Sequence, residues 1–171
     1  RGLPGLYLDP LLKTLFLKKM SDEMMVNYLR SNLLDSSSPN PSIETLLHAY
    51  LPFKYVDHTH SNAILSLVNL ENSKEILNKI YKDKIAIVPY VMPGFELAKL
   101  CYKVISKNQK IEGLILLNHG IFTFGISAKQ SYDRMIKLVT LAENFLKKQK
   151  KLIKYNNNNN KIKVSDVQLC I

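Results

Sequence analysis

Residues 113–125 read GLILLNHGIFTFG, two apolar runs that meet at Asn118, His119 and Gly120. Each run has the length and composition of a buried strand. A glycine between two strand-like runs indicates a tight turn, since glycine is otherwise unfavourable inside a strand. This stretch therefore predicts two strands joined by a short antiparallel connection.

Helices and further strands alternate around this junction. Apolar spacing and stop signals predict helices over residues 21–30, 43–51, 61–70, 73–83 and 94–108. The runs at 53–60 and 84–91 are expected to be strands. We expect Ser21, Ser42 and either Ser61 or Asn62 to cap helix N-termini. The alternation favours an α/β sheet layered by helices, with some antiparallel pairing.

A long amphipathic helix is expected to close the fold. Ser127 and Gln130 have the spacing of a capping box at its start. Its core-facing stripe is predicted to be Met135, Ile136, Leu138, Val139, Ala142, Phe145 and Leu146.

Size and composition indicate one ordinary globular domain. The chain has 171 residues, of which 46% are hydrophobic and 22% charged. Cys101 and Cys170 lie far apart and form no CxxC motif. Isolated thiols are typical of a reducing compartment, so we expect a cytoplasmic protein. No apolar run reaches the roughly eighteen residues that predict a membrane span, so no membrane partner is expected.

The formal net charge of +10 does not by itself indicate a nucleic-acid-binding site. The chain has only three arginines, although arginine is the better reader of phosphates and bases. Its densest basic group lies at the end of the long helix, where the helix dipole favours cations. That group is Lys147, Lys148, Lys150, Lys151 and Lys154. We expect a solvated basic surface and no nucleic-acid partner.

Three of the four histidines occupy positions that suit a metal site. In YVDHTH, residues 55–60, His58 and His60 are two residues apart, so a strand would present both rings on one face. His119 follows another apolar strand, and folds of this class place their sites at strand ends. Three nitrogen ligands would leave one coordination position open for a substrate. The alternative is that the pair packs or faces solvent and that His119 is structural.

Glu44 is the candidate proton shuttle. It lies in a first helical turn after Pro41 and Ser42, where the helix dipole should keep its carboxylate ionised. Acidic residues are also common in first turns without any chemical role. His48 lies one turn later on the same face, and we expect it to pack rather than to assist Glu44.

Four ordered segments together resemble the class II aldolase/adducin family. They are PSIETLLHAYLP at 41–52, VDHTH at 56–60, VPYVMPGFELAK at 88–99 and LLNHGIFTFG at 116–125. More narrowly, they resemble the aldolase part of bifunctional rhamnulose-1-phosphate aldolase/alcohol dehydrogenases. The resemblance implies a three-layer α/β/α sandwich with a central mixed, largely antiparallel sheet. It places this domain at residues 1–154, without the family's N-terminal part, and an Asn/Lys-rich tail at 155–171.

The resemblance also implies a role for each motif residue. A PSxE motif carries the acid/base, here Glu44, and the HxH and NHG motifs carry zinc ligands. His58, His60 and His119 would thus bind one Zn²⁺ per subunit, with another divalent metal as the alternative. Ser42 matches a serine that helps to bind substrate phosphate, whereas Ile43 stands where several relatives have a second serine.

The function implied by the resemblance is a zinc-dependent class II aldolase that cleaves a ketose or ketose 1-phosphate by retro-aldol chemistry. Zinc would stabilise the enediolate and Glu44 would move the proton. A tyrosine, with Tyr81 and Tyr90 in the right region, would protonate the leaving group.

Two alternatives stay open. One is an epimerase or dehydratase of the same fold acting on sugar phosphates, and the other is a non-catalytic adducin-like binding module. Loss of the metal histidines would mark the binding module, and this chain has all three. The family also implies a homotetramer. No GxGxxG motif of a dehydrogenase occurs in the chain.

Overall fold

The computed structural model describes residues 3–156, with side chains up to residue 150. The described helices are α1 (Leu8–Lys13), α2 (Asp22–Ser31), α3 (Thr45–Tyr50), α4 (Asn62–Val68), α5 (Ser73–Tyr81), α6 (Phe95–Lys107) and α7 (Ala128–Asn156), with 3-10 turns η1 (Thr14–Phe16) and η2 (Lys82–Lys84). The strands are β1 (Tyr55–Thr59), β2 (Ile85–Val88), β3 (Gly113–Leu116) and β4 (Gly120–Gly125). The tail expected at residues 155–171 lies outside the described residues beyond Asn156.

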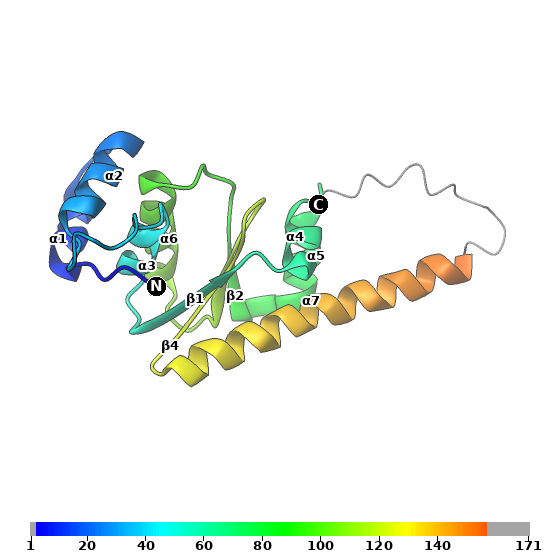
Figure 1. Ribbon diagram of the computed structural model, residues 1–171. Coiled ribbons are helices and arrows are strands. Elements are labelled where there is room, and N and C mark those ends of the chain that lie inside the picture. Colours follow the sequence, from blue (N-terminus) through cyan, green and yellow to red (C-terminus); the bar gives the residue numbers. More distant parts are fainter. Residues whose placement is uncertain (1–2, 157–171) are drawn as a thin grey trace.

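The four strands form one sheet in the order β1-β4-β3-β2 (Figure 1). β4 pairs antiparallel with both β1 and β3, whereas β2 and β3 are parallel. The predicted mixed, largely antiparallel sheet is confirmed. The turn between β3 and β4 places Asn118 at φ +55°, a left-handed conformation that asparagine adopts more readily than most residues.

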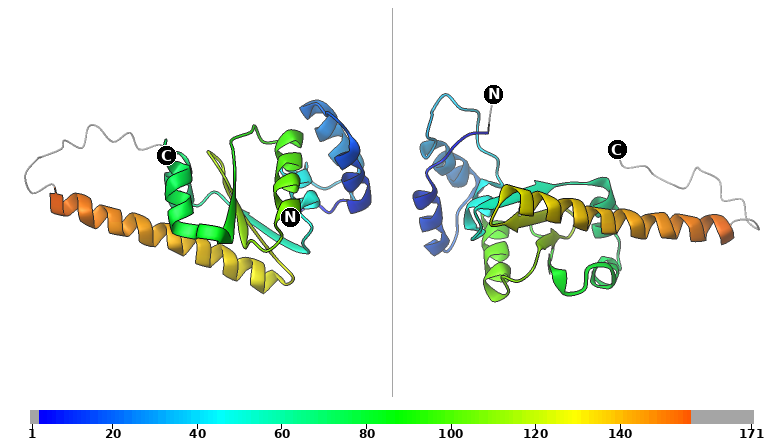
Figure 2. Two further views of the ribbon diagram at one scale, coloured as in Figure 1. Left: turned by 180° about the vertical axis from the view of Figure 1, so that it is seen from behind. Right: turned by 90° about the horizontal axis from the view of Figure 1, so that it is seen from below.

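Helices cover both faces of this sheet, which confirms the three-layer architecture (Figure 2). Side chains alternate along a strand, so Leu114 and Leu116 of β3 pack with α3 and α6, while Ile115 packs with α4, α5 and α7. Cys101 of α6 belongs to the first of these clusters as a buried free thiol. The sheet therefore separates two apolar cores.

Three of the predicted helix caps, Ser21, Ser61 and Ser127, are confirmed, and the fourth, Ser42, is wrong. The Oγ of Ser21 accepts a hydrogen bond from the amide of Met24, and the Oγ of Ser61 accepts one from Ile64. Ser42 does not cap α3, because that helix begins at Thr45 with Glu44 as its N-cap residue. The Ser42 Oγ instead accepts from the amide of Glu44 at 3.1 Å, which closes a local turn before the helix.

The core-facing stripe predicted for α7 is confirmed except at one position. Met135, Leu138 and Ala142 are buried against the sheet, but Ile136 is 49% exposed. Ile136 follows Met135 directly, and consecutive residues on a helix point about 100° apart, so Ile136 falls outside the buried stripe. The C-terminal turns of α7 extend past the sheet (Figures 1 and 2).

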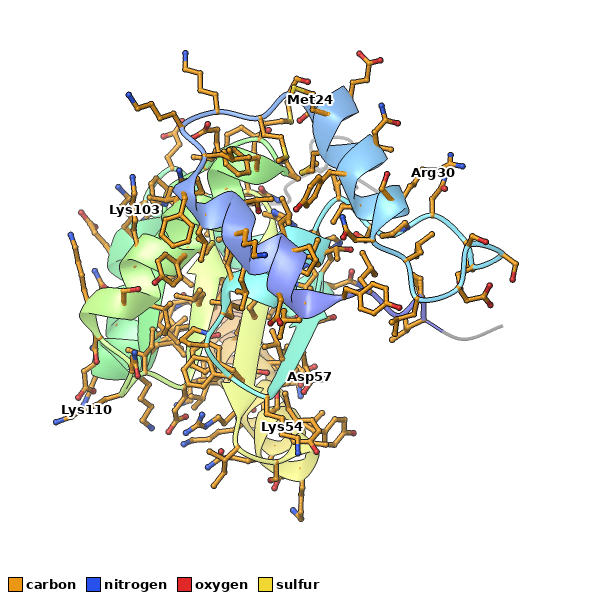
Figure 3. All side chains as sticks on the ribbon, turned by 90° about the vertical axis from the view of Figure 1, so that its left-hand side faces the viewer. Met24, Arg30, Lys54, Asp57, Lys103 and Lys110 are labelled. Atoms are coloured by element: carbon orange, nitrogen blue, oxygen red, sulfur yellow. The ribbon has the colours of Figure 1, made fainter. Side chains whose placement is uncertain are left out.

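The basic residues on one face of the molecule are dispersed. Arg30, Lys54, Lys103 and Lys110 project from separate elements in different directions (Figure 3). The charge on this face is therefore not gathered into a single patch. Among the described residues, no helix combines the length and apolarity that crossing a membrane requires.

Candidate metal centre

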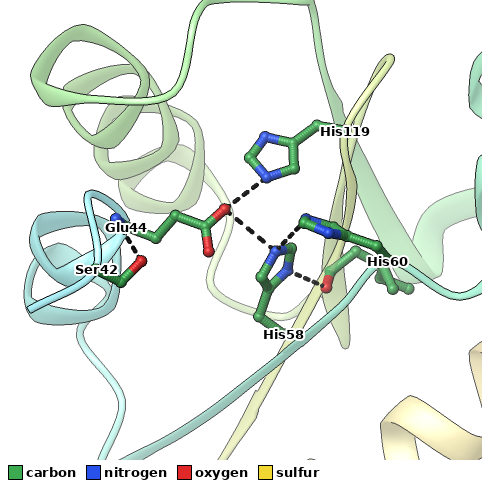
Figure 4. Close-up of polar contacts among 6 residues, drawn as sticks. Ser42, Glu44, His58, His60 and His119 are labelled. Carbon is green, nitrogen blue, oxygen red and sulfur yellow. Dashed lines mark hydrogen bonds and ion pairs between the residues drawn. The ribbon is translucent and has the colours of Figure 1, made fainter.

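Four side chains from separate parts of the chain converge at one end of the sheet (Figure 4). His58 lies on β1, His60 directly follows that strand, His119 lies in the β3–β4 turn, and Glu44 lies at the start of α3. One nitrogen or oxygen atom from each lies within 4.8 Å of all the others. The structure thus brings together the three histidines and the acid singled out in the sequence.

His58 is oriented by the neighbouring strand. Its Nδ1 lies 2.9 Å from the carbonyl oxygen of Ile121, and a carbonyl can only accept, so Nδ1 carries the proton. In the neutral imidazole, Nε2 then presents a lone pair to the cluster. The ring also stacks on Phe122, with centroids 3.8 Å apart and an interplanar angle of 9°. Metal-binding histidines are commonly oriented by such a bond through the other nitrogen.

His60 reaches the cluster because the residue of β4 beside it is Gly120, which has no side chain. The Nε2 atoms of His58 and His60 are 2.9 Å apart. A Cβ atom on Gly120 would lie 2.7 Å from the carbonyl oxygen of Thr59 and 2.8 Å from Cδ2 of His60. Partial burial is the main cause that lowers the pKa of His60, and the nearby His58 ring is the second. A lower pKa favours the neutral ring that a metal requires.

His119 is presented by a turn that is tied to a neighbouring helix. The amide of Asn118 donates to the carbonyl of Val68, and its side-chain Nδ2 donates to Oδ1 of Asn69 at 3.0 Å. These bonds join the turn to the C-terminal end of α4. The His119 Nε2 lies 2.6 Å from Oε1 of Glu44, while its Nδ1 is buried without a hydrogen-bond partner in the described structure.

Glu44 is the anionic member of the cluster. Its Oε1 is 2.6 Å from Nε2 of His119 and 3.3 Å from Nε2 of His58. Close contact with Nε2 of His119 first, and with the His58 ring second, holds the pKa of Glu44 well below its usual range. These contacts favour the ionised carboxylate, which is the form that the sequence predicts from the helix dipole.

The chemistry of the donors fits a divalent cation. Imidazole nitrogens and a carboxylate oxygen are the ligands that zinc and similar metals take in proteins. When the His58 ring is neutral with its proton on Nδ1, the lone pair of its Nε2 faces a carboxylate oxygen and another ring nitrogen, an arrangement of electron-rich atoms that a cation stabilises. Zn–N bonds of about 2.0–2.1 Å place tetrahedral ligands roughly 3.3 Å apart. The Nε2 atom of His58 lies at similar distances, 2.9 Å from Nε2 of His60 and 3.3 Å from Oε1 of Glu44. The cluster could therefore hold a metal ion.

The sequence profile described as Class II Aldolase and Adducin N-terminal domain matches residues 13–146. The chain belongs to this family. The family membership predicted from the four motifs is confirmed.

Similar proteins of this class II aldolase-family chain include one sequence relative and two solved aldolase structures. YuxG of Bacillus subtilis (strain 168), described as an uncharacterized oxidoreductase, is 41% identical over 142 residues, which are 83% of this chain and 21% of YuxG. The N-terminal class II aldolase domain of a conserved protein from Thermoplasma acidophilum is 42% identical, with a TM-score of 0.77, over 84% of this chain and 66% of that one. A sugar-phosphate aldolase from Thermotoga maritima is 26% identical, with a TM-score of 0.58, over 68% and 57%. The chain thus spans about a fifth of its curated relative.

A cleft of about 440 Å³ opens beside the cluster of this family member. Its wall is formed by Ser42, Ile43, Glu44, His60, Tyr90, Pro93, Asn118 and His119. Three of the four clustered residues therefore border a space that is large enough for a small substrate. Ser42 reaches this wall with an exposed hydroxyl.

The structure distinguishes the two tyrosines that the sequence left open. Tyr81 is buried in the core on the α7 side of the sheet, and its hydroxyl donates to the carbonyl of Leu138 at 2.9 Å. Tyr90 lines the cleft and is 54% exposed. Sequence reasoning could not separate them, because only the fold shows which ring reaches the site.

His48 stays outside the cluster, as expected. Its ring packs edge-on against Phe122, with centroids 5.4 Å apart, and burial lowers its pKa. A neutral, packed imidazole agrees with a structural role for this residue.

Proposed function

We propose that this chain is the catalytic domain of a zinc-dependent class II aldolase that cleaves a ketose or ketose 1-phosphate. The observation that carries the proposal is the convergence of Glu44 with three imidazoles beside a cleft, in a chain of this family. The similarity to a sugar-phosphate aldolase from Thermotoga maritima supports a sugar-phosphate substrate. The motifs favour rhamnulose 1-phosphate or a close analogue.

In this proposal His58, His60 and His119 hold the metal. A bound Zn²⁺ would act as a Lewis acid that withdraws charge from the carbonyl oxygen of the substrate. Glu44, at the wall of the cleft, accepts the proton that the substrate hydroxyl beside the breaking carbon–carbon bond gives up, and it delivers a proton to the enediolate carbon once the aldehyde has formed. Its position within the cluster keeps the base next to the carbon on which negative charge develops.

Two hydroxyls complete the proposed site. The Ser42 Oγ accepts from the amide of Glu44, so its own hydrogen is left to donate to an oxygen of the substrate or its phosphate. Tyr90 lines the cleft, and its hydroxyl is the candidate relay for the proton that the substrate hydroxyl gives up as the aldehyde forms.

Further parts of the proposal follow from the family resemblance. The domain extends over residues 1–154, one Zn²⁺ binds per subunit, and subunits assemble as a homotetramer in the cytoplasm. The presence of all three histidines disfavours a purely binding, adducin-like role.

The test is retro-aldol activity of the zinc-loaded protein on ketose 1-phosphates, with detection of the aldehyde product. We expect chelation to abolish cleavage. Glu44→Gln should keep its zinc and lose roughly 10²- to 10⁴-fold in rate, the usual contribution of general acid–base catalysis. Glu23→Gln is the control, because Glu23 is an exposed acid in the first turn of α2, outside the cluster.

Zinc content provides an independent check on the ligands. His58→Ala and His119→Ala should each lose stoichiometric zinc, and unchanged stoichiometry would exclude this site. If the substrate is converted but no aldehyde forms, the result would instead indicate epimerisation at the same centre.

A further inference from the structure

Two contacts hold the imidazole of His58: a hydrogen bond at its edge and an aromatic stack against its face. The hydrogen bond between Nδ1 and the carbonyl oxygen of Ile121, 2.9 Å long, fixes one corner of the ring. That bond alone would let the ring rock about the line joining the two atoms. The parallel stack on Phe122, at 3.8 Å and 9°, restricts this remaining rotation. Nε2, on the far side of the ring, is therefore aimed at the cluster.

Phe122 is itself a rigid support. It is fully buried in β4, a strand with partners on both sides, and stands in register with His58 of β1 and Leu114 of β3. It belongs to the apolar core that α3 and α6 complete. Its ring cannot leave the His58 face without opening that core.

The same ring contacts α3, the helix that follows Glu44. His48 of α3 lies edge-on to Phe122 at 5.4 Å and 65°, and the amide of His48 donates to the carbonyl of Glu44. The His119 ring lies 6.5 Å away at 76°. Phe122 thus lies between the strand that carries one imidazole and the helix that carries the carboxylate.

We propose that Phe122 is a positioning residue of the metal centre. Its ring fixes the plane of the His58 imidazole, so that Nε2 faces the donors of Glu44, His60 and His119 before any ion arrives. This inference rests on the metal centre of the proposed function. Outer-shell groups that orient ligands in this way are known to control metal affinity.

Phe124 provides a matched control within the same strand. It lies two residues further along β4, is fully buried in the same core, and stacks on Phe53 at 4.1 Å and 7°. The two phenylalanines therefore share burial and stacking geometry. They differ in that the partner of Phe122 presents a nitrogen to the cluster.

The experiment compares Phe122→Leu with Phe124→Leu. Leucine keeps the position apolar but has no aromatic ring that could stack on an imidazole. Zinc affinity is measured by competition with a chromophoric chelator, and the absorption spectrum of bound Co²⁺ reports ligand geometry. We expect Phe122→Leu to bind zinc roughly 10- to 100-fold more weakly, as outer-shell changes typically do, and to alter the Co²⁺ spectrum. Phe124→Leu should lose thermal stability but keep the wild-type affinity and spectrum.

Wild-type zinc affinity and Co²⁺ spectrum in Phe122→Leu would overturn the inference, and so would equal losses of affinity in both variants. If Phe122→Leu does not fold, NMR of the wild-type protein decides. Stacking should shift the His58 ring protons upfield in both the metal-free and the zinc-loaded protein. Signals at the positions of an unstacked imidazole in the metal-free protein would refute a preset ring.

These outcomes are separable from failure of the proposed function. Zinc affinity is measured without substrate, so an inactive protein that binds zinc and responds to Phe122→Leu would refute the aldolase reaction and support the positioning role. A wild-type protein that binds no zinc would refute both.

Discussion

Gly120 lies where β4 passes closest to the histidines of β1. The nearest atoms to a Cβ built there are the carbonyl oxygen of Thr59 at 2.7 Å, Cδ2 of His60 at 2.8 Å and Cε1 of His58 at 3.2 Å. Two of these atoms belong to proposed metal ligands, and the third is backbone that cannot rotate away. Because a Cβ atom would collide with these neighbours, only glycine fits at this position.

Gly120→Ala should therefore destabilise the fold and weaken zinc binding. Overpacking of this kind costs about 1–3 kcal/mol. Gly5→Ala is the control, since its Cβ would meet Cδ1 of Leu34, the far end of a flexible side chain, at a similar 2.8 Å. Denaturant unfolding and zinc titration measure the two effects. Equal behaviour of both variants would show that the close approach is unimportant.

Residue types in the sequence were enough to select Glu44, His58, His60 and His119 as candidates. The contact between Glu44 and His119 joins residues 75 positions apart, so no local pattern could reveal it. Phe122 was read only as part of an apolar strand. Its stack on His58 depends on the pairing of β1 with β4, which the sequence did not specify.

At the scale of single elements, α7 shows how a helix start is stabilised. The Ser127 Oγ accepts from the amide of Gln130 at 3.1 Å, as the predicted capping box requires. The Gln130 side chain reaches back one residue further than expected and accepts from the amide of Ile126 at 2.8 Å. Two backbone donors at the entry to α7 are thereby satisfied.

Ser127→Ala should remove one of these bonds and lower the free energy of unfolding by about 0.5–2 kcal/mol. Ser106→Ala is a suitable control, because the Ser106 hydroxyl bonds back to the carbonyl of Tyr102 within α6 and caps no helix start. Chemical denaturation of both variants measures the difference. A Ser127→Ala protein as stable as the wild type would contradict the capping role.

Helix and strand positions were largely predictable, because apolar periodicity and capping serines are local signals. The cap expected at Ser42 failed for a physical reason: its hydroxyl closes a turn, and the helix begins only at Thr45. Ile136 was assigned to the core of α7 because it is apolar, but its place on the helix leaves it half exposed. Such errors arise where packing decides between locally equivalent choices.

For the molecule as a whole, the cluster gathers side chains from three separate segments of the chain. These are the start of α3, the end of β1 and the β3–β4 turn. A metal bound to donors from all three would bind the folded state and not the unfolded chain. Metal binding and folding stability are therefore coupled.

Zinc should raise the midpoint of thermal unfolding, and EDTA should reverse the rise. At a free zinc concentration 100 times the Kd, the gain is about 2.7 kcal/mol. His119→Ala should abolish it. His48→Ala, which changes the one histidine outside the cluster, should lower stability but keep the response to zinc. A zinc-induced rise that persists in His119→Ala would place the metal elsewhere.

The pairing of β1 with β4 also determines when this centre can form during synthesis. His58 and the Ile121 carbonyl that orients it are 63 positions apart, so the histidines of β1 leave the ribosome well before their supporting strand. A nascent chain that stops short of Gly120 carries His58 and His60 without a partner strand to arrange them. A metal ion at this centre would therefore be held in its final geometry only after β4 has been synthesised.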